Sequence, residues 1–301
     1  MKHPDHFQGR RAFLSNTLKI AGGYTFLTHL PLKAQAFSPV SYTVQDVIDL
    51  VLKEGRLDPL NDTVDTLKSG KGNQKVTGII TTMFTTLPVM EAAIKQGANF
   101  IIAHEPTFYN HKDELDWVAD NKVALRKKEF LEKQGIAVWR FHDYCHRMKP
   151  DMISHGVAKE AGWLDYQAED QISFQIPAMH LDQIARHLKA RLQIQQLRVI
   201  GDMKQRCSAL AILPGAWGGQ RHVETVEKRD PDVLIVGELS EWETAEYIRD
   251  RRAQGKKTAL IVLGHAVSEE PGMKYFAEWL RPKLPGVMVR HQPSGSPFTW
   301  I

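Results

Sequence analysis

The sequence predicts an α/β fold with two lobes, each built on a mostly parallel sheet. Short, almost continuously apolar runs alternate with longer amphipathic segments, a pattern typical of alternating strands and helices. The apolar runs lack polar alternation, so they fit parallel strands covered on both faces. This alternation of apolar runs and amphipathic segments occurs twice, on either side of a mixed stretch at residues 166–205. We therefore expect an N-terminal lobe at residues 37–170 and a C-terminal lobe at residues 171–301, with a metal site in the cleft between them.

The N-terminal half begins with a predicted helix at residues 43–54, and a polar connection at residues 61–74 follows. Three apolar runs have the length of buried strands: residues 78–84, 99–103 and 136–141. After the first run, Thr85 and Thr86 can cap a helix that ends at Gly97. A second helical pattern covers residues 114–134 before the third run. Each predicted strand is thus joined to the next by one helix, which favours right-handed parallel crossovers.

The C-terminal half repeats this alternation. Strands are predicted at residues 172–176, 209–213, 232–236 and 258–263, and helices at residues 181–192, 219–228 and 242–254. Residues 172–176 alternate between apolar and polar side chains, unlike the other runs, so we expect that strand to be half-buried.

The formal charge of +4 is carried entirely by residues 1–36, which leaves residues 37–301 neutral. A neutral body lacks the excess positive charge that would attract nucleic acid or an anionic membrane. The charge pattern therefore argues against nucleic acid as a partner.

Residues 1–36 resemble a twin-arginine export signal. A basic start leads into Arg10-Arg11 and a mildly apolar stretch, and Ala34-Gln35-Ala36 resembles a cleavage site. Lys19 and several other interruptions make the stretch unsuited to a stable membrane span, and a frayed amphipathic helix is the alternative interpretation. The signal predicts an exported, periplasmic protein. Because this route carries folded proteins, it also suits one that loads a metal before export.

Polar clusters follow three of the predicted strands directly. His104 and Glu105 follow one, His142 to His146 follow the next, and His265 to Glu269 follow the last. The carboxyl ends of parallel strands gather ligand-binding loops at one edge of a sheet. Imidazoles and carboxylates together suit zinc, iron or manganese. The sequence therefore predicts a metal site at this edge.

The spacing within the last cluster supports shared coordination. His265 and Glu269 are four residues apart, so both lie on one face if a helix begins there. Pro271 suits the first turn of a helix, which indicates a cap at Ser268 with His265 just outside the helix. Either arrangement lets both side chains face the site.

The succession of these blocks resembles the Nif-three-like family, also labelled type-two GTP cyclohydrolase I-like, whose members are dinuclear-metal α/β proteins. Six blocks carry the resemblance: residues 78–84, 97–106, 135–142, 237–239, 264–269 and 296–298. The family has His-His-Pro where this chain has His104-Glu105-Pro106. It has an aspartate four positions after the second-cluster histidine, where this chain has His146 after His142.

The resemblance implies a ligand set for two divalent ions: His104, Glu105, His146, His265 and Glu269. The two departures exchange one histidine for a carboxylate and one carboxylate for a histidine, so the total ligand charge is unchanged. We take Glu269 as the bridging carboxylate. The alternative ligands, or residues orienting a ligand imidazole, are His142, Asp143 and Glu238.

A metal-dependent hydrolase of a small phosphate-bearing or heterocyclic molecule is the favoured function, with a bound water activated near neutral pH. A metal carrier or scaffold without turnover is the alternative. Candidate proton-transfer residues are His111, Asp113 and Glu270, and Tyr109 and Trp139 can form a wall for a planar substrate. The resemblance also implies homo-oligomers, commonly ring-shaped hexamers.

Overall fold

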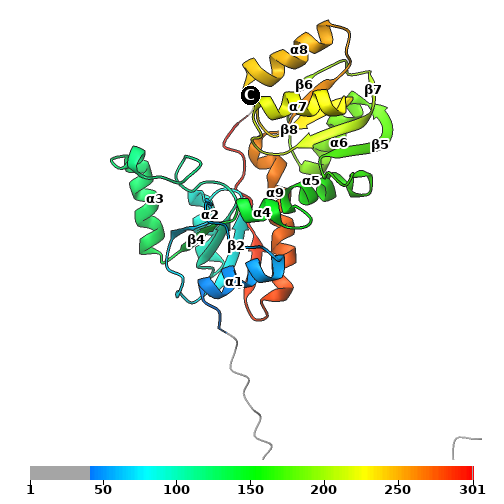
Figure 1. The fold of residues 1–301 in the computed structure, drawn as a ribbon. Coiled ribbons are helices and arrows are strands. Elements are labelled where there is room, and N and C mark those ends of the chain that lie inside the picture. Colours follow the sequence, from blue (N-terminus) through cyan, green and yellow to red (C-terminus); the bar gives the residue numbers. More distant parts are fainter. Residues whose placement is uncertain (1–40, 300) are drawn as a thin grey trace, which may run out of the picture. The chain divides into compact units, whose positions relative to one another are not determined.

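The computed structural model describes residues 41–299 and 301, and these belong to one compact unit. The predicted leader lies outside the described residues. The unit contains two five-stranded sheets (Figure 1). The α/β prediction with mostly parallel sheets is therefore confirmed.

The first sheet has the strand order β1-β4-β3-β2-β10. Its strands are β1 (Leu67–Ser69), β2 (Gly78–Thr82), β3 (Phe100–Ala103), β4 (Ala137–Arg140) and β10 (Met288–His291). All neighbours are parallel except β1, which runs antiparallel to β4 at the edge. Strand β10 comes from the end of the chain, so the chain returns to its first sheet. The predicted lobe boundaries at residues 37–170 and 171–301 stay a prediction.

Helices connect these strands, and the sequence predicts all of them except the two that follow β4. They are α1 (Val44–Gly55), α2 (Leu87–Lys95), the 3₁₀ turn η1 (Asp116–Val118), α3 (Lys122–Lys133), α4 (Asp143–Arg147) and α5 (Met152–Ala161). Thr43 caps α1, and Thr86 caps α2 through a bond from the Val89 backbone N–H. Helix α3 begins at the cap Asn121 and not at residue 114, because the preceding residues form a separate 3₁₀ turn.

The second sheet has the order β5-β7-β8-β9-β6. Its strands are β5 (Ser173–His180), β6 (Arg198–Ile200), β7 (Arg206–Leu213), β8 (Val233–Val236) and β9 (Ala259–Val262). Its central strands β7, β8 and β9 are parallel, whereas the edge strands β5 and β6 are antiparallel. Strand β5 alternates between buried and exposed residues in its first half, as expected for an edge.

The remaining helical elements are η2 (Leu164–Tyr166), α6 (Leu181–Leu192), α7 (Gly219–Arg229), a π-helical turn η3 (Glu241–Ala245), α8 (Glu246–Ala253), α9 (His265–Leu280) and η4 (Arg281–Lys283). Helix α9 starts directly after β9 of the second sheet, yet it packs on α5 and on β2 and β10 of the first sheet. Gly156 of α5 and Gly272 of α9 have no side chains to separate the helices there, and a Cβ at either would overlap the other helix. Helix α9 therefore connects the end of β9, in the second sheet, with the first sheet.

Both faces of each sheet are covered by apolar side chains. Ile79 and Ile102 belong to one core cluster, and Ile80 and Ile101 belong to another. Successive strand residues point to opposite faces, so the two clusters lie on the two faces of the first sheet. Two further clusters contain alternate residues of the second sheet. This burial explains why the sequence shows continuous apolar runs.

Five helices and strands of the described residues were not predicted, namely β1, α4, α5, β6 and β10. Strand β1 lies within the predicted polar connection and has only three residues, too few to show a period. Helix α9 begins at His265 and not after Ser268, so the predicted cap was wrong. Gly264 adopts a φ of 104°, which lets the chain turn out of β9 one residue earlier.

Candidate metal centre

The predicted polar clusters lie where β3, β4 and β9 end. His104 and Glu105 directly follow β3, His142 precedes α4 just after β4, and His265 is the first residue of α9. His104 is fully buried, and Glu105 and Glu269 are nearly so. The structure therefore brings side chains from three distant stretches of sequence to one place.

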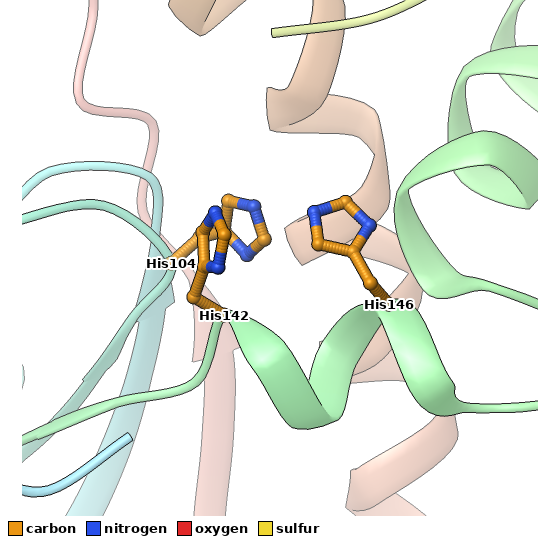
Figure 2. A group of neighbouring side chains, drawn as sticks. All are labelled: His104, His142 and His146. Carbon is orange, nitrogen blue, oxygen red and sulfur yellow. The ribbon is translucent and has the colours of Figure 1, made fainter. Parts of the chain in front are cut away.

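Three imidazoles form the first part of the site. One ring nitrogen of each of His104, His142 and His146 lies within 4.8 Å of the others; we call these residues the imidazole trio. Figure 2 shows His142 at the start of α4 and His146 further along the same helix, with His104 behind His142. The His104 and His142 rings stack with centroids 4.7 Å apart, and the His146 ring meets both edge-on.

Each ring of the imidazole trio has an acceptor at its Nδ1 atom. The backbone oxygen of Phe141 lies 3.0 Å from Nδ1 of His104. The corresponding acceptors are Asp143 Oδ1 at 3.0 Å for His142 and Asp151 Oδ2 at 2.9 Å for His146. A carbonyl or carboxylate oxygen can only accept, so each Nδ1 donates. In a neutral ring the Nε2 atom then carries the lone pair that a metal needs.

His104 shows most clearly that the residues of the site fit a metal. Its Nε2 atom is buried and has no hydrogen-bond partner among the described residues. Buried polar atoms without a partner are uncommon and call for an explanation. A divalent cation at this atom would supply that partner, so the donor set fits a metal.

A second group combines carboxylates with an imidazole: Glu105, Glu269 and His265, which we call the carboxylate set. Nε2 of His265 lies 3.0 Å from Glu269 Oε2 and 3.4 Å from Glu105 Oε1. The two carboxylates also form a potential metal-binding group with His104, whose Nε2 atom is 3.8 Å from Glu269 Oε2. Glu269 thus lies between His104 and His265, as its predicted bridging role requires.

Charge is balanced within the carboxylate set. Burial opposes ionisation of Glu105, but its bond with His265 and the nearby imidazoles hold its pKa at about 2. Burial also opposes protonation of His265, yet three surrounding carboxylates raise its pKa to about 12. Burial raises the pKa of the Glu269 carboxyl. A proton on His265 therefore supplies positive charge that a divalent ion can replace.

Comparison with known proteins identifies the family. Residues 66–294 match the model of the Duf34/NIF3 (NGG1p interacting factor 3) family. This chain is a Duf34/NIF3 protein. The resemblance seen in the sequence is thereby confirmed, whereas the twin-arginine signal stays a prediction.

Relatives of this Duf34/NIF3 protein share its fold. A Clostridium acetobutylicum protein described as a GTP cyclohydrolase 1 type 2 homolog is 24% identical over 232 residues, which cover 72% of this chain and 81% of the relative. The crystal structure of Staphylococcus aureus hypothetical protein SA1388 has a TM-score of 0.68 at 19% identity, covering 88% of this chain and all of that one (100%). A Bacillus cereus protein related to NIF3 gives a TM-score of 0.63 at 17% identity, with coverage of 88% and 100%.

Arg140 supports Glu105, the residue that stands where the resemblance leads one to expect histidine. Its guanidinium is buried, lies 3.6 Å from Glu105 Oε2 and 3.5 Å from Asp113 Oδ2, and donates to the backbone oxygen of His104. Lys68 completes this buried network at 3.6 Å from Asp113. The sequence analysis missed Arg140, although an arginine inside an apolar strand was a usable signal.

Asp65 and Asp151 were also missed. Asp65 accepts the backbone N–H groups of residues 142–144 at 2.8, 3.1 and 2.8 Å, and so fixes the start of α4. Burial raises its pKa to about 6 although these bonds lower it. Asp151 caps α5 and also holds His146. No local pattern marks Asp65, whereas Asp151 stands before an apolar stretch in the manner of a cap.

The structure places the alternative ligands at the margin of the site. Asp143 accepts from Thr63 Oγ1 at 2.8 Å and from His142, so it orients that imidazole. Glu238 is exposed and lies 3.2 Å from Nδ1 of His265. Whether these residues orient a ligand or bind a metal themselves stays a prediction.

The predicted proton-transfer residues separate into two places. The exposed His111 ring meets the His142 ring edge-on at 5.7 Å. Glu270 lies 3.1 Å from Nε2 of His291 and accepts from Ser294 Oγ at 2.9 Å. Asp113 forms ion pairs with Arg140 and Lys68.

Neither predicted wall residue lies against the cluster. Trp139 is buried in the core and donates to the Asp65 backbone oxygen. Tyr109 is exposed beside Lys127. Aromatic residues next to strands are usually core, and Trp139 follows that rule.

A pocket of about 920 Å³ opens beside the carboxylate set. His265 and Glu238 lie in its wall, together with apolar side chains such as Phe84 and Val267 and the amides of three glutamines, Gln193, Gln195 and Gln196. Residues 296–299 close another side. The pocket therefore offers an apolar space beside charged groups. Among the described residues, no helix is both long and apolar enough to cross a membrane.

Proposed function

We propose that this Duf34/NIF3 protein binds two divalent ions, zinc, iron or manganese, and hydrolyses a small substrate in the adjacent pocket. The single observation that carries the proposal is the Nε2 atom of His104, which is buried and has no hydrogen-bond partner in the described part of the chain. It lies at the junction of the imidazole trio and the carboxylate set, because the potential metal-binding groups share His104. A divalent ion would give this atom the partner that a buried polar atom normally has.

The residues of the site divide the chemical work. When bound, two divalent ions would polarise the bond under attack and lower the pKa of water to near neutrality. Glu269 would face both ions, since its Oε2 atom lies near Nε2 of both His104 and His265. Glu238 would keep His265 oriented through Nδ1. His111 is the preferred proton-transfer candidate, because Glu270 is occupied by His291 and Ser294.

The pocket favours a heterocyclic substrate over a purely phosphate-bearing one. Most of its lining side chains are apolar, and the exposed carboxylate of Glu238 at its wall would repel an anion. Arg198 also lines the pocket, but it is paired with Glu241. A flat, uncharged ring with amide-like edges would match the apolar walls and the glutamines. The name of the Clostridium relative, a GTP cyclohydrolase 1 type 2 homolog, is consistent with ring hydrolysis.

The test combines metal analysis with turnover. Purified protein is expected to contain two ions per chain by elemental analysis, with their positions seen in an anomalous-scattering map. Hydrolysis is then assayed on panels of heterocycles, amides and phosphoesters. Glu269→Gln is expected to lose activity at least about 100-fold, since it removes a metal-facing charge. Glu278→Gln is the matched control on the same helix, where Glu278 forms an exposed pair with Lys159.

Two results would reject the hydrolase. If the protein holds two ions but turns over no compound in the panels, it is a metal carrier or scaffold. If Glu269→Gln hydrolyses substrate as fast as Glu278→Gln, the carboxylate set is not the reactive centre.

We further propose that the protein is exported to the periplasm and assembles as a homo-oligomer, a hexamer by the family resemblance. The leader with Arg10-Arg11 supports export. Changing both arginines to lysine should retain the precursor in the cytoplasm, as fractionation would show. Light scattering of the mature protein measures the assembly.

A further inference from the structure

We infer that the two cation positions are chemically unequal: the imidazole trio holds one ion through three nitrogens, and the carboxylate set holds the other. This inference deepens the proposed function and rests on its premise that the site binds two ions. Its new element is His142, which becomes a metal ligand rather than a residue that only orients another imidazole.

The hydrogen bonds of His142 match those of its two neighbours. All three rings of the trio have Nδ1 engaged by an oxygen acceptor at 2.9 to 3.0 Å. Histidines that ligate metals almost always have this arrangement, with the second ring nitrogen donating to a carboxylate or backbone carbonyl. A histidine that merely oriented another ligand would donate to that ligand. His142 instead donates to Asp143, and its Nε2 atom has Glu105 Oε1 as a carboxylate neighbour at 3.7 Å.

The geometry also divides the donors into two groups of three. The Nε2 atom of His104 can serve one ion, and the nearest imidazoles to its ring are His142 and His146. The remaining donors are Glu105, Glu269 and His265, and Nε2 of His265 lies within 3.4 Å of an oxygen of each carboxylate. Glu269 adjoins both groups through its Oε2 atom, so it is the side chain that can join the two positions.

The two groups differ in charge and in ligand type. The trio is an uncharged set of nitrogen donors, which suits zinc or another borderline ion. The carboxylate set brings two negative charges and oxygen donors, which suit a harder ion such as manganese. His146 creates this asymmetry, because it stands where the family resemblance leads one to expect an aspartate. The first equivalent of zinc should therefore enter the trio, while manganese should favour the carboxylate set.

Zinc X-ray absorption tests the assignment independently of turnover. Metal-free protein is loaded with one equivalent of Zn²⁺, and imidazole multiple scattering counts the histidine ligands. The wild-type protein is expected to show three imidazoles, and His142→Ala two. Competition with a chelator should show zinc binding weakened at least about tenfold in His142→Ala. The matched control is His111→Ala, which removes a neighbouring exposed imidazole and should change neither value.

A second variant covers the case in which His142→Ala does not fold. His146→Asp keeps a ligand at that position and should lower the imidazole count to two while strengthening manganese binding relative to zinc. Equal zinc affinity and an equal imidazole count in wild type and His142→Ala would overturn the inference. If His146→Asp binds manganese no more strongly relative to zinc than the wild-type protein does, the inference is also overturned. Failure of the wild-type protein to bind zinc or manganese at all would overturn both this inference and the proposed function.

Discussion

At the scale of single residues, the site depends on positions that carry no ligand atom of their own. Gly215 has a φ of 72°, and a Cβ on it would overlap the carboxylate of Glu269. Its backbone N–H also donates to Ser268 Oγ at 2.9 Å, and Ser268 in turn donates to the His265 backbone oxygen at 2.7 Å. One glycine therefore leaves space for a ligand and fastens the first turn of α9.

Gly215→Ala is predicted to weaken metal binding at least about tenfold, because displaced ligands of this kind cost affinity on that scale. The control is Gly218→Ala, at a φ of 80° with open space where the Cβ would stand among the described residues. Both variants carry the strain of a left-handed alanine. Isothermal titration with zinc separates them, and equal affinities would contradict the prediction.

Burial of His222 makes its contribution to stability depend on pH. This side chain is fully buried with Nδ1 2.8 Å from Thr244 Oγ1. Burial lowers its pKa to about 4, although Glu243 raises it. The folded protein thus keeps His222 neutral while the unfolded chain protonates near its ordinary pKa of 6.5.

The His222 contribution to stability is therefore complete above about pH 6.5 and is lost as the pH falls toward 4. Urea unfolding at pH 7 and pH 5 measures this loss. His222→Gln is expected to lose less of its unfolding free energy between these pH values than the wild-type protein does. An identical loss in both proteins would show that His222 does not titrate in this window.

At the scale of elements, helix starts position the ligands. Asp65 fixes the first turn of α4, which carries His142 and His146 at its two ends. Asp151 caps α5 through Oδ1 and holds His146 through Oδ2. The N-terminus of α5 and the orientation of a metal ligand are thus coupled by one carboxylate.

Asp151→Asn is predicted to keep the cap but to place an amide N–H against Nδ1 of His146. Zinc affinity should fall about 10- to 100-fold, with little change in thermal stability. Asp151→Ala should lose the same affinity and also about 1 kcal/mol of stability with the cap. Calorimetric titration and thermal melting measure the two effects. Wild-type affinity in Asp151→Asn would show that this bond does not orient His146.

At the scale of the whole molecule, the site joins segments that are far apart in sequence. The side chains at positions 104, 146 and 265 follow β3, lie on α4 and begin α9. An ion held by such residues cross-links the fold, because the unfolded chain does not present them together. Metal binding should therefore appear as global stability.

Added zinc is predicted to raise the melting temperature as its concentration increases. At a zinc concentration of 100 times Kd, the free energy of unfolding should be about 2.7 kcal/mol higher than without zinc. His146→Ala should show a much smaller shift. His155→Ala, which removes an imidazole packed on Tyr275, should respond like the wild type. The prediction fails if His146→Ala and His155→Ala are stabilised equally.

Much of the fold followed from local pattern. Buried parallel strands are continuously apolar, so β2, β3, β4, β8 and β9 were visible in the sequence. Short edge strands were not: β1, β6 and β10 have three or four residues each, and their partners lie far along the chain. The start of α9 was misplaced because Pro271 lies inside the helix, where it is normally disfavoured.

The sequence by itself determined the α/β class, the family, and the histidines and carboxylates that gather at the strand ends. These depend on residue type and order, which are local. Only the tertiary structure decided which oxygen holds each Nδ1, that Arg140 and Asp65 support the site, and that His104 has a buried nitrogen without a partner among residues 41–299. Such pairings depend on the positions of loops and distant elements in the folded chain. Short-range periodicity in the sequence does not encode those positions.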